Sequence, residues 1–223
     1  MKNFFYFILF FLISWFSFSK EKRKENVNVI EYVKKYAVFA IEEMEKFGIP
    51  ASIKLGQGIL ESSSGNSSLS KATNNHFGIK CGKNWMGDVY YHDDDFPKEC
   101  FRKYDSVQES FHDHSKFLQQ PRYSKLFLLK KEDYQAWATE LKKAGYATSL
   151  NYADLLIDQI EKYYLWKFDQ KTSCSIEKRI NQYLNYIMLM HKNKDSFLRM
   201  LGKKLRFFYK IFLLITNKKK IES

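Results

Sequence analysis

Apolar residues recur at intervals of three and four through residues 28–170, and this spacing predicts a mainly helical domain. A first helix is expected over residues 28–47, with a glycine to end it and a proline to begin the next. The second helix is expected from about Ala51 to Ser62. It contains Gly56 and Gly58, each of which costs about 1 kcal/mol relative to alanine in a helix interior. We therefore expect close packing at these two positions.

The rest of the domain is expected to contain a hairpin and further helices. Residues 88–91 and 99–104 are extended pieces on either side of a turn that holds Pro97, which predicts a small β-hairpin. Residues 63–75 are rich in Ser, Gly and Asn and are expected to form a loop. Helices are expected in three places: from the capping box Ser106–Glu109 to about Gln120, over about residues 132–143, and after Asn151 as a cap.

The first 19 residues differ from everything that follows. Lys2 precedes an apolar run of about 15 residues, which is the length of a signal-peptide core and short for a membrane span of roughly 20. Ser17–Ser19 is an acceptable cleavage site, but the basic cluster 20–24 favours retention on the cytoplasmic side. A cleaved signal peptide and an N-terminal membrane anchor therefore both remain open. Either predicts export to the periplasm or cell envelope, with residues 20–27 as a polar tether.

The net charge of +12 is concentrated at the ends of the chain. Residues 171–223 contain thirteen Lys/Arg and three acidic residues, whereas residues 29–170 contain nineteen and twenty. The basic tail has helical apolar spacing over 176–190 and an apolar run at 207–215 that is too short to span a bilayer. It suits an anionic envelope or membrane surface, or it packs on the main domain. No nucleic-acid module accompanies the charge, so no nucleic-acid partner is expected.

The cysteines fit an exported protein. Cys81 and Cys100 flank the predicted hairpin, so their ends could be adjacent and form a disulfide. Two small buried thiols are the alternative. Neither a CxxC spacing nor a Cys/His zinc pattern is present.

Glu61 is the first candidate for chemistry. It ends an apolar helical stretch, and a Ser/Gly/Asn loop follows it. A half-buried carboxylic acid has a raised pKa and can give a proton to the leaving oxygen of a glycosidic bond. The pattern alone leaves open that Glu61 is an ordinary solvated helix residue.

Three consecutive carboxylates, Asp93–Asp95, are the second candidate. They repel one another, so they suggest a bound cation or the second carboxylate of a hydrolase. A solvated acidic turn is the alternative. Alternation along a strand places Asp94 on the face opposite Asp93 and Asp95, so only one or two of the three can point into a cleft.

Other reaction types have little support. His112 and His114 are two apart on a predicted helix and face different directions, so no metal site is expected from them. Ser62–Ser64 lack the hydrolase elbow of a serine triad. Among the aromatic residues, Trp85 and Tyr146 lie in predicted loops and suit a sugar ring better than core residues do.

Seven short motifs occur in a fixed order and together resemble the glucosaminidase domain of glycoside hydrolase family 73, the mannosyl-glycoprotein endo-beta-N-acetylglucosaminidase type. That family includes bacterial autolysins and the flagellar peptidoglycan hydrolase. The resemblance covers about residues 30–165. The motifs are Gln57–Ser62, Asn75–Lys80, Trp85-x-Gly87, Phe101–Ser106, Glu109-Ser110, Arg122-Tyr123, and Ala144–Thr148 with Tyr152-Ala153.

The resemblance implies a lysozyme-like fold, mainly α (α+β), with a small β-hairpin lobe over a substrate groove. It implies Glu61 as the catalytic acid and Tyr146 as the active-site tyrosine. The family's second carboxylate lies in the hairpin, where we favour Asp94 or Asp95 over Glu99. The residues expected to bind substrate are Phe77, Trp85, Tyr123 and Asn75, and no cofactor or metal is expected.

The implied activity is hydrolysis of the β-1,4 bond between N-acetylglucosamine and N-acetylmuramic acid in peptidoglycan, with inversion or retention left open. Two other functions also fit the pattern. One is a membrane-tethered peptidoglycan-binding module without catalysis. The other is a muramidase or lytic transglycosylase that cleaves the other glycosidic linkage.

Overall fold

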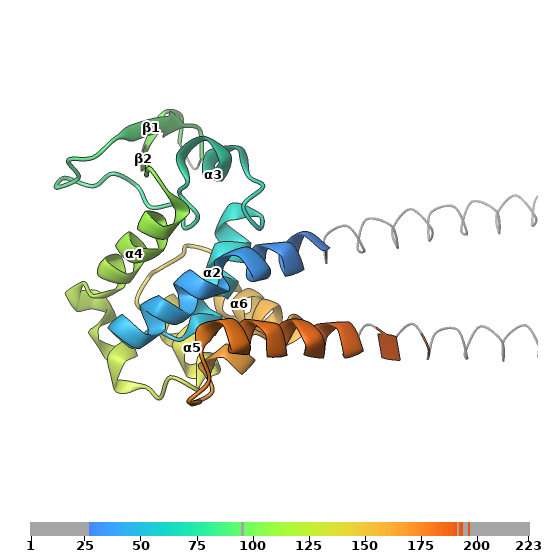
Figure 1. Ribbon diagram of the computed structural model, residues 1–223. Coiled ribbons are helices and arrows are strands. Elements are labelled where there is room, and N and C mark those ends of the chain that lie inside the picture. Colours follow the sequence, from blue (N-terminus) through green and yellow to red (C-terminus); the bar gives the residue numbers. More distant parts are fainter. Residues whose placement is uncertain (1–26, 95, 191, 194–195, 197–223) are drawn as a thin grey trace, which may run out of the picture. The chain divides into compact units, whose positions relative to one another are not determined.

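The computed structural model describes residues 27–94, 96–190, 192–193 and 196 (Figure 1). The chain divides into two compact units, one up to Ile180 and one from Asn181. The expectations for residues 1–19 and 207–215 lie outside the described residues, and so does the tether 20–27 except for Val27, which begins the first helix. None of the described helices is long and apolar enough to cross a membrane.

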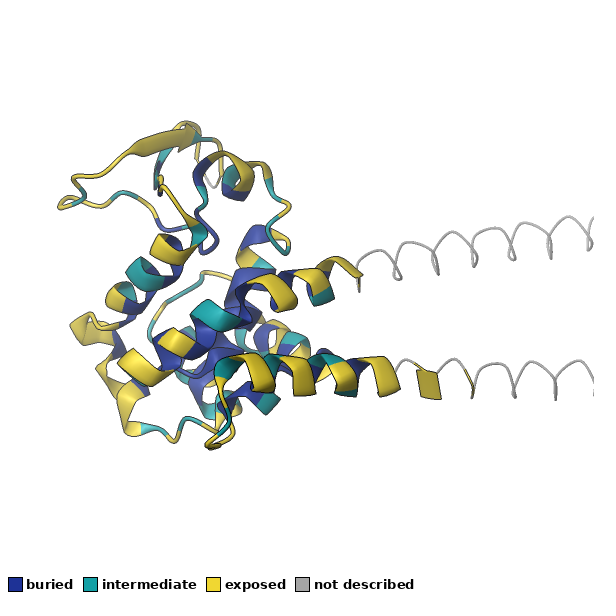
Figure 2. Cartoon of the chain, viewed as in Figure 1, coloured by how far each residue is buried: buried dark blue, intermediate teal, exposed yellow. Residues whose placement is uncertain are grey.

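Helix α2 (Ala51–Ser62) is the central element of the first unit and has the bounds that the sequence predicts. It contacts α5 (Tyr134–Lys143), α6 (Tyr152–Lys162) and the short 3-10 helix η2 (Leu165–Asp169). The residues from Ala51 to Ile59 are all buried, polar ones included, which is seen as the dark interior in Figure 2. Because α2 is enclosed, the long polar side chains of Lys54 and Gln57 hydrogen-bond to other groups inside the protein.

The two glycines of α2 make close contacts. This packing was expected, because each glycine weakens the helix. A Cβ on Gly58 would lie 2.2 Å from the Tyr32 hydroxyl, and one on Gly56 would lie 2.7 Å from Cδ1 of Leu156. Tyr32 belongs to the first helix, which is described from residue 27 to 47. A hydrogen bond of 3.0 Å between its hydroxyl and Nδ1 of His76 holds its ring. Gly58 therefore lets the first helix approach α2.

Gly58→Ala is expected to destabilise the protein by about 1–2 kcal/mol, because overpacking against the fixed Tyr32 ring outweighs the gain of about 1 kcal/mol in helix propensity. Urea unfolding would measure the change. Gly56→Ala is the matched control, with a smaller expected loss, because the end of the Leu156 side chain can rotate away. A Gly58→Ala protein more stable than the parent would contradict this packing argument.

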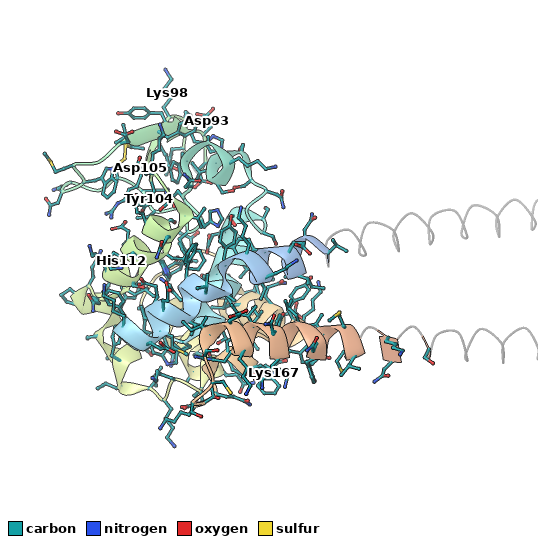
Figure 3. All side chains as sticks on the ribbon, in the orientation of Figure 1. Asp93, Lys98, Tyr104, Asp105, His112 and Lys167 are labelled. Carbon is teal, nitrogen blue, oxygen red and sulfur yellow. A yellow bond between two sulfur atoms is a disulfide. The ribbon has the colours of Figure 1, made fainter. Side chains whose placement is uncertain are left out.

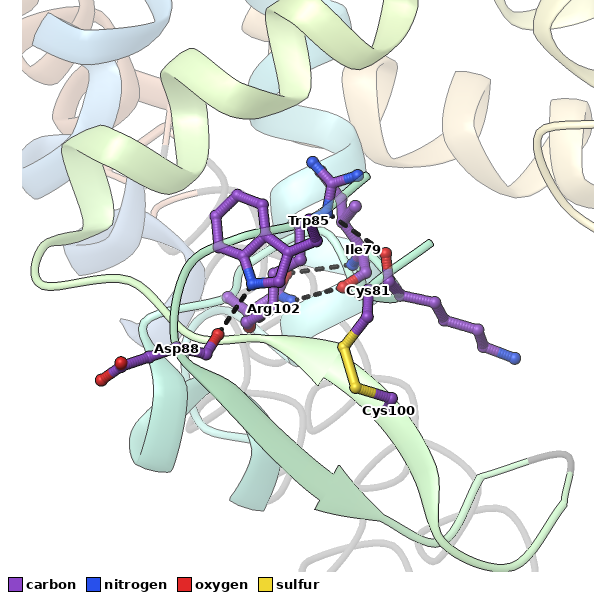
Figure 4. Close-up of a disulfide and its surroundings, with 8 residues drawn as sticks. Ile79, Cys81, Trp85, Asp88, Cys100 and Arg102 are labelled. Carbon is purple, nitrogen blue, oxygen red and sulfur yellow. Dashed lines mark hydrogen bonds between the residues drawn. A yellow bond between two sulfur atoms is a disulfide. The ribbon is translucent and has the colours of Figure 1, made fainter. Parts of the chain in front are cut away.

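Strands β1 (Val89–His92) and β2 (Glu99–Arg102) form the expected antiparallel hairpin, with Tyr90 opposite Phe101. A disulfide joins Cys81 to Cys100, so the segment before the hairpin is tied to β2 (Figure 4). The tip is closed by the Lys98 backbone N–H, which donates to Oδ1 of Asp93 at 2.8 Å (Figure 3). The hairpin is mostly exposed, and these two links fix its shape.

Helix α4 (Val107–Leu118) begins at the predicted cap. The Ser106 hydroxyl accepts from the Glu109 backbone N–H at 3.2 Å, and the Glu109 carboxylate accepts from the backbone N–H of Asp105 at 3.1 Å. Helix α6 begins after Asn151, as expected, although the Asn151 side chain makes no capping bond to it. It accepts instead from the Ser149 hydroxyl at 2.6 Å.

One prediction of local structure is wrong. The segment 63–75 is not all loop, because it contains the short helix α3 (Ser68–Thr73), capped by Ser67. With one large apolar residue, Leu69, among its six, α3 shows no apolar periodicity. The 3-10 helix η1 (Pro121–Leu128) was not predicted either. The fold class is confirmed, since the described residues are mainly helical and carry one small antiparallel hairpin.

Candidate active site

The end of α2 is built to hold Glu61 at a fixed place. The Ser62 hydroxyl donates to the Gly58 carbonyl at 2.5 Å and accepts from the Gly65 backbone N–H at 2.7 Å. Ser63 and Ser64 are left-handed, with φ of 51° and 57°, so the chain turns sharply away from the helix. Glu61 therefore sits on the last helical turn with its carboxyl group beside open space.

The carboxyl group of Glu61 reaches solvent but is crowded by protein. Burial, opposed by a hydrogen bond from Tyr152 and assisted by the charge of Asp94, raises the Glu61 pKa to about 7. The Tyr152 hydroxyl donates to Oε1 of Glu61 at 3.1 Å and accepts from Nε2 of Gln57 at 3.0 Å. Gln57 lies one helical turn before Glu61 and thus orients the tyrosine that donates to the acid.

A cleft of about 580 Å³ opens in front of Glu61. The hairpin side contributes Asp94 and Arg102, and the loop after α5 contributes Tyr146. Its floor and walls combine charged, amide and aromatic groups, which suits a polar ligand with apolar faces, such as a sugar. The lining residues are Glu61, Phe77, Gly78, Ile79, Lys80, Gly82, Asp94, Arg102, Phe117, Gln120, Tyr146, Ala147 and Thr148.

The acidic residues of the hairpin have separate positions. Asp93 closes the tip, whereas Asp94 lines the cleft, 3.9 Å from Nζ of Lys80. Glu99 pairs with the same lysine at 2.7 Å. Asp95 lies outside the described residues. Asp94 is therefore the described hairpin carboxylate that shares the cleft with Glu61.

The four residues predicted to bind substrate divide into one in the cleft and three elsewhere. Phe77 lines the cleft, but Asn75, Trp85 and Tyr123 are not among its lining residues. Asn75 is buried and ties the loop to the hairpin, because its Nδ2 donates to the carbonyls of Ile79 and Arg102, both at 2.9 Å. Direct substrate contact by Asn75 stays a prediction, and in the structure its amide nitrogen is used by the fold.

Tyr123 and Trp85 support the cleft from behind. Tyr123 is fully buried, and its ring lies 6.3 Å from that of Tyr146. Trp85 stacks on the guanidinium of Arg102 at 4.7 Å and donates to the Asp88 carbonyl at 2.9 Å (Figure 4). Direct substrate contact by Trp85 and Tyr123 stays a prediction, and in the structure their rings pack against Arg102 and Tyr146, which themselves line the cleft.

The comparisons with known proteins agree with this arrangement. The family model described as glucosaminidase, mannosyl-glycoprotein endo-beta-N-acetylglucosaminidase, matches residues 37–165, which is more than half of the chain. The chain belongs to this glucosaminidase family. The match confirms the resemblance seen in the seven motifs.

Two curated relatives of this glucosaminidase-family chain come from bacteria. It is 34% identical over 164 residues to the exo-glucosaminidase LytG of Bacillus subtilis, covering 68% of this chain and 54% of LytG. It is 32% identical over 143 residues to the peptidoglycan hydrolase FlgJ of Vibrio parahaemolyticus, covering 59% of this chain and 46% of FlgJ. The chain thus spans about half the length of these curated relatives.

The fold is also shared with solved structures of peptidoglycan hydrolases. The crystal structure of the peptidoglycan hydrolase from Sphingomonas sp. A1 matches with a TM-score of 0.56 and 30% identity. That match covers 66% of this chain and 98% of the Sphingomonas chain. The expected lysozyme-like architecture of the glucosaminidase domain is therefore found.

Sequence reasoning missed the polar groups behind the cleft of this glucosaminidase-family domain. His112 and His114 do face different directions: His112 lies 3.1 Å from Oε1 of Glu43, and Nε2 of His114 lies 3.1 Å from the Tyr146 hydroxyl. Lys54 Nζ lies 3.2 Å from Nδ1 of His114. A lysine inside an apolar helix was the available signal. Among the described residues, no cluster of three His, Cys, Asp or Glu side chains is suited to a metal ion.

Tyr152→Phe is expected to raise the pKa of Glu61 further, because the tyrosine hydrogen bond favours the carboxylate and so lowers that pKa. Carbon NMR of the Glu61 carboxyl group across a pH titration would measure the change. Tyr134→Phe is the matched control, since Tyr134 donates to Glu161 at 3.1 Å on the surface. A lower Glu61 pKa in Tyr152→Phe would show that the hydrogen bond is not formed as described.

Proposed function

We propose that this protein is a peptidoglycan hydrolase that cleaves the β-1,4 bond between N-acetylglucosamine and N-acetylmuramic acid, with Glu61 as the general acid. The observation that carries the proposal is the position of the Glu61 carboxyl group at the end of α2, beside an open cleft that also holds Asp94. Burial raises the pKa of this carboxyl group to about 7. Such an acid is largely protonated just below neutral pH and can still give up its proton. Family membership and the similarity to LytG and FlgJ support the substrate class.

In the proposed reaction, Glu61 gives its proton to the oxygen that leaves the glycosidic bond while positive charge develops on the sugar ring. Asp94 stands on the hairpin side of the cleft and is the group proposed to act from the opposite side of the bond. Asp94 either activates a water molecule, which inverts the configuration of the anomeric carbon, or it stabilises an attack by the N-acetyl group of the substrate, which retains that configuration. The anomeric form of the first product distinguishes the two courses.

Digestion of purified peptidoglycan tests the proposal. The full-length protein and its Glu61→Gln variant are incubated with peptidoglycan, and new ends are identified by mass spectrometry. Fragments with reducing N-acetylglucosamine ends, released by the parent alone, are the expected result. Ends of anhydro-muramic acid would assign a lytic transglycosylase, and reducing muramic acid ends a muramidase. If both proteins bind peptidoglycan without cleaving it, the protein is a peptidoglycan-binding module.

We further propose export to the periplasm or cell envelope, supported by the signal-peptide-like residues 1–19. The basic residues 171–223 are proposed to hold the protein to an anionic envelope or membrane surface. Deletion of residues 171–223 should reduce sedimentation with cell walls more than it reduces cleavage of soluble fragments. Unchanged sedimentation would reject the role of the tail.

A further inference from the structure

Lys54 is a lysine in the interior of the protein, with none of its surface exposed. Its Nζ lies 2.5 Å from the Phe111 carbonyl, 2.7 Å from the Ser115 hydroxyl and 3.2 Å from Nδ1 of His114. None of these contacts is with a carboxylate. Lysine is almost never fully buried without an ionic partner, and removing its charge from water is costly. A lysine in this position therefore needs an explanation.

The surroundings of Lys54 fit the charged ammonium. An ammonium has three N–H donors and no acceptor, and three acceptors surround this one. The rings of Phe77 and Phe111 lie 5.2 and 5.6 Å from Nζ and offer their faces to a cation. Burial lowers the Lys54 pKa to about 7, while the charges of Glu43 and Asp113 oppose that change. Lys54 is thus charged mainly below neutral pH.

The charged Lys54 selects one form of His114. If Lys54 donates to Nδ1, that nitrogen carries a lone pair, so the ring proton resides on Nε2. Burial, aided by the charge of Lys54, lowers the His114 pKa well below its usual range, so the imidazole is neutral. Its ring stacks on Phe77 with centroids 3.9 Å apart, which fixes its orientation. The Nε2–H group then points to the Tyr146 hydroxyl at 3.1 Å.

The tautomer of His114 decides what Tyr146 offers to the cleft. When Tyr146 accepts from Nε2–H, its own hydroxyl proton has no acceptor among the described residues and can be given to a ligand. Burial raises the Tyr146 pKa well above its usual value, so the phenol keeps that proton. With the opposite tautomer, Tyr146 would donate to His114 and present only lone pairs to the cleft.

We propose that Lys54 is a positioning residue that holds His114 as the Nε2–H tautomer, so that Tyr146 donates its hydroxyl proton to an oxygen of the bound glycan. The proposal rests on the proposed function for the identity of the ligand. It adds to that function a buried chain of three groups, Lys54, His114 and Tyr146, drawn from α2, α4 and the loop after α5. In this arrangement neither Lys54 nor His114 touches the substrate.

The tautomer is measured first, because it does not depend on any activity. In the full-length protein at about pH 6, roughly one unit below the Lys54 pKa of about 7, nitrogen NMR should show His114 with a protonated Nε2 and a bare Nδ1. The His114→Gln variant identifies the His114 signals by their loss. A protonated Nδ1 in the parent would overturn the proposal, since Lys54 would then be accepting rather than donating.

Kinetics test whether Lys54 and His114 act on the reaction through Tyr146. Lys54→Met removes the donor at similar length and is expected to lower kcat by about tenfold to a hundredfold, as for loss of one oriented donor, with KM changed less than about twofold. Tyr146→Phe should lose at least as much. In the double variant, Lys54→Met should cause no further loss, because its effect passes through the missing hydroxyl. Equal losses in both backgrounds would show a merely structural role and overturn the proposal.

Two further variants keep the test decisive if Lys54→Met does not fold. His114→Gln keeps an N–H donor near Tyr146 and should retain more activity than His114→Phe, which has none. Equal activity of the Gln and Phe variants would overturn the proposal. A parent that cleaves no glycan would refute the proposed function and leave the tautomer measurement standing.

Discussion

Glu61→Gln is expected to lower kcat on peptidoglycan fragments by about a hundredfold to ten-thousandfold, the usual contribution of a general acid. The amide has nearly the shape of the acid and can still accept from Tyr152 at the position of Oε1. It has no proton to give to the leaving oxygen, so the loss should fall on kcat, with KM close to that of the parent. Initial rates over a range of fragment concentrations would separate the two constants.

The pH profile of the parent is the companion measurement. The Glu61 pKa is raised from 4.5 to about 7, so the acid is protonated and active below neutral pH and loses its proton above it. The rate should therefore fall by about tenfold for each pH unit above the pKa. With an ordinary pKa, the fall would begin in the acid range. Full activity of Glu61→Gln, or a parent rate that rises through neutral pH, would reject Glu61 as the acid.

Local signals in the sequence were sufficient for the elements that position the acid. Apolar spacing and Pro50 locate α2 from Ala51 to Ser62, and the Ser106 box locates the start of α4. Each of these features acts within one or two helical turns, so it can be recognised without tertiary information. Helix α3 has no such signal, because its six residues are stabilised by the Ser67 cap and by contacts distant in sequence.

The residues behind the cleft meet through contacts between positions that are distant in the sequence, and the spacing of residues does not reveal such contacts. Lys54 and His114 are 60 residues apart, and Tyr152 and Glu61 are 91 apart, yet each pair is in hydrogen-bonding distance. A lysine on a helix normally indicates a solvated face, so the sequence did not indicate that Lys54 is buried. Similarly, Asn75 and Tyr123 belong to the family motifs, but the motifs do not tell whether a residue touches substrate or supports one that does.

Asp94→Asn is expected to lower kcat by about tenfold to a hundredfold, which is less than the loss from Glu61→Gln because water or the substrate can partly replace a base but not the acid. Half of the Asp94 side chain is exposed, at 54%, and it lines the cleft next to Lys80. Its charge raises the Glu61 pKa, so its removal should also shift the alkaline fall of activity to lower pH. The loss should accordingly be larger above neutral pH than below it.

Asp93→Asn is the matched control for Asp94→Asn. Its amide oxygen can still accept from the Lys98 backbone N–H at the hairpin tip, and Asp93 is not among the residues that line the cleft. We expect its rate to stay within about twofold of the parent, as for a surface change without a catalytic contact. Equal losses in the two variants would assign the effect to the shape of the hairpin. A parent-like rate and pH profile in Asp94→Asn would remove Asp94 from the reaction and direct the next substitution to Asp95.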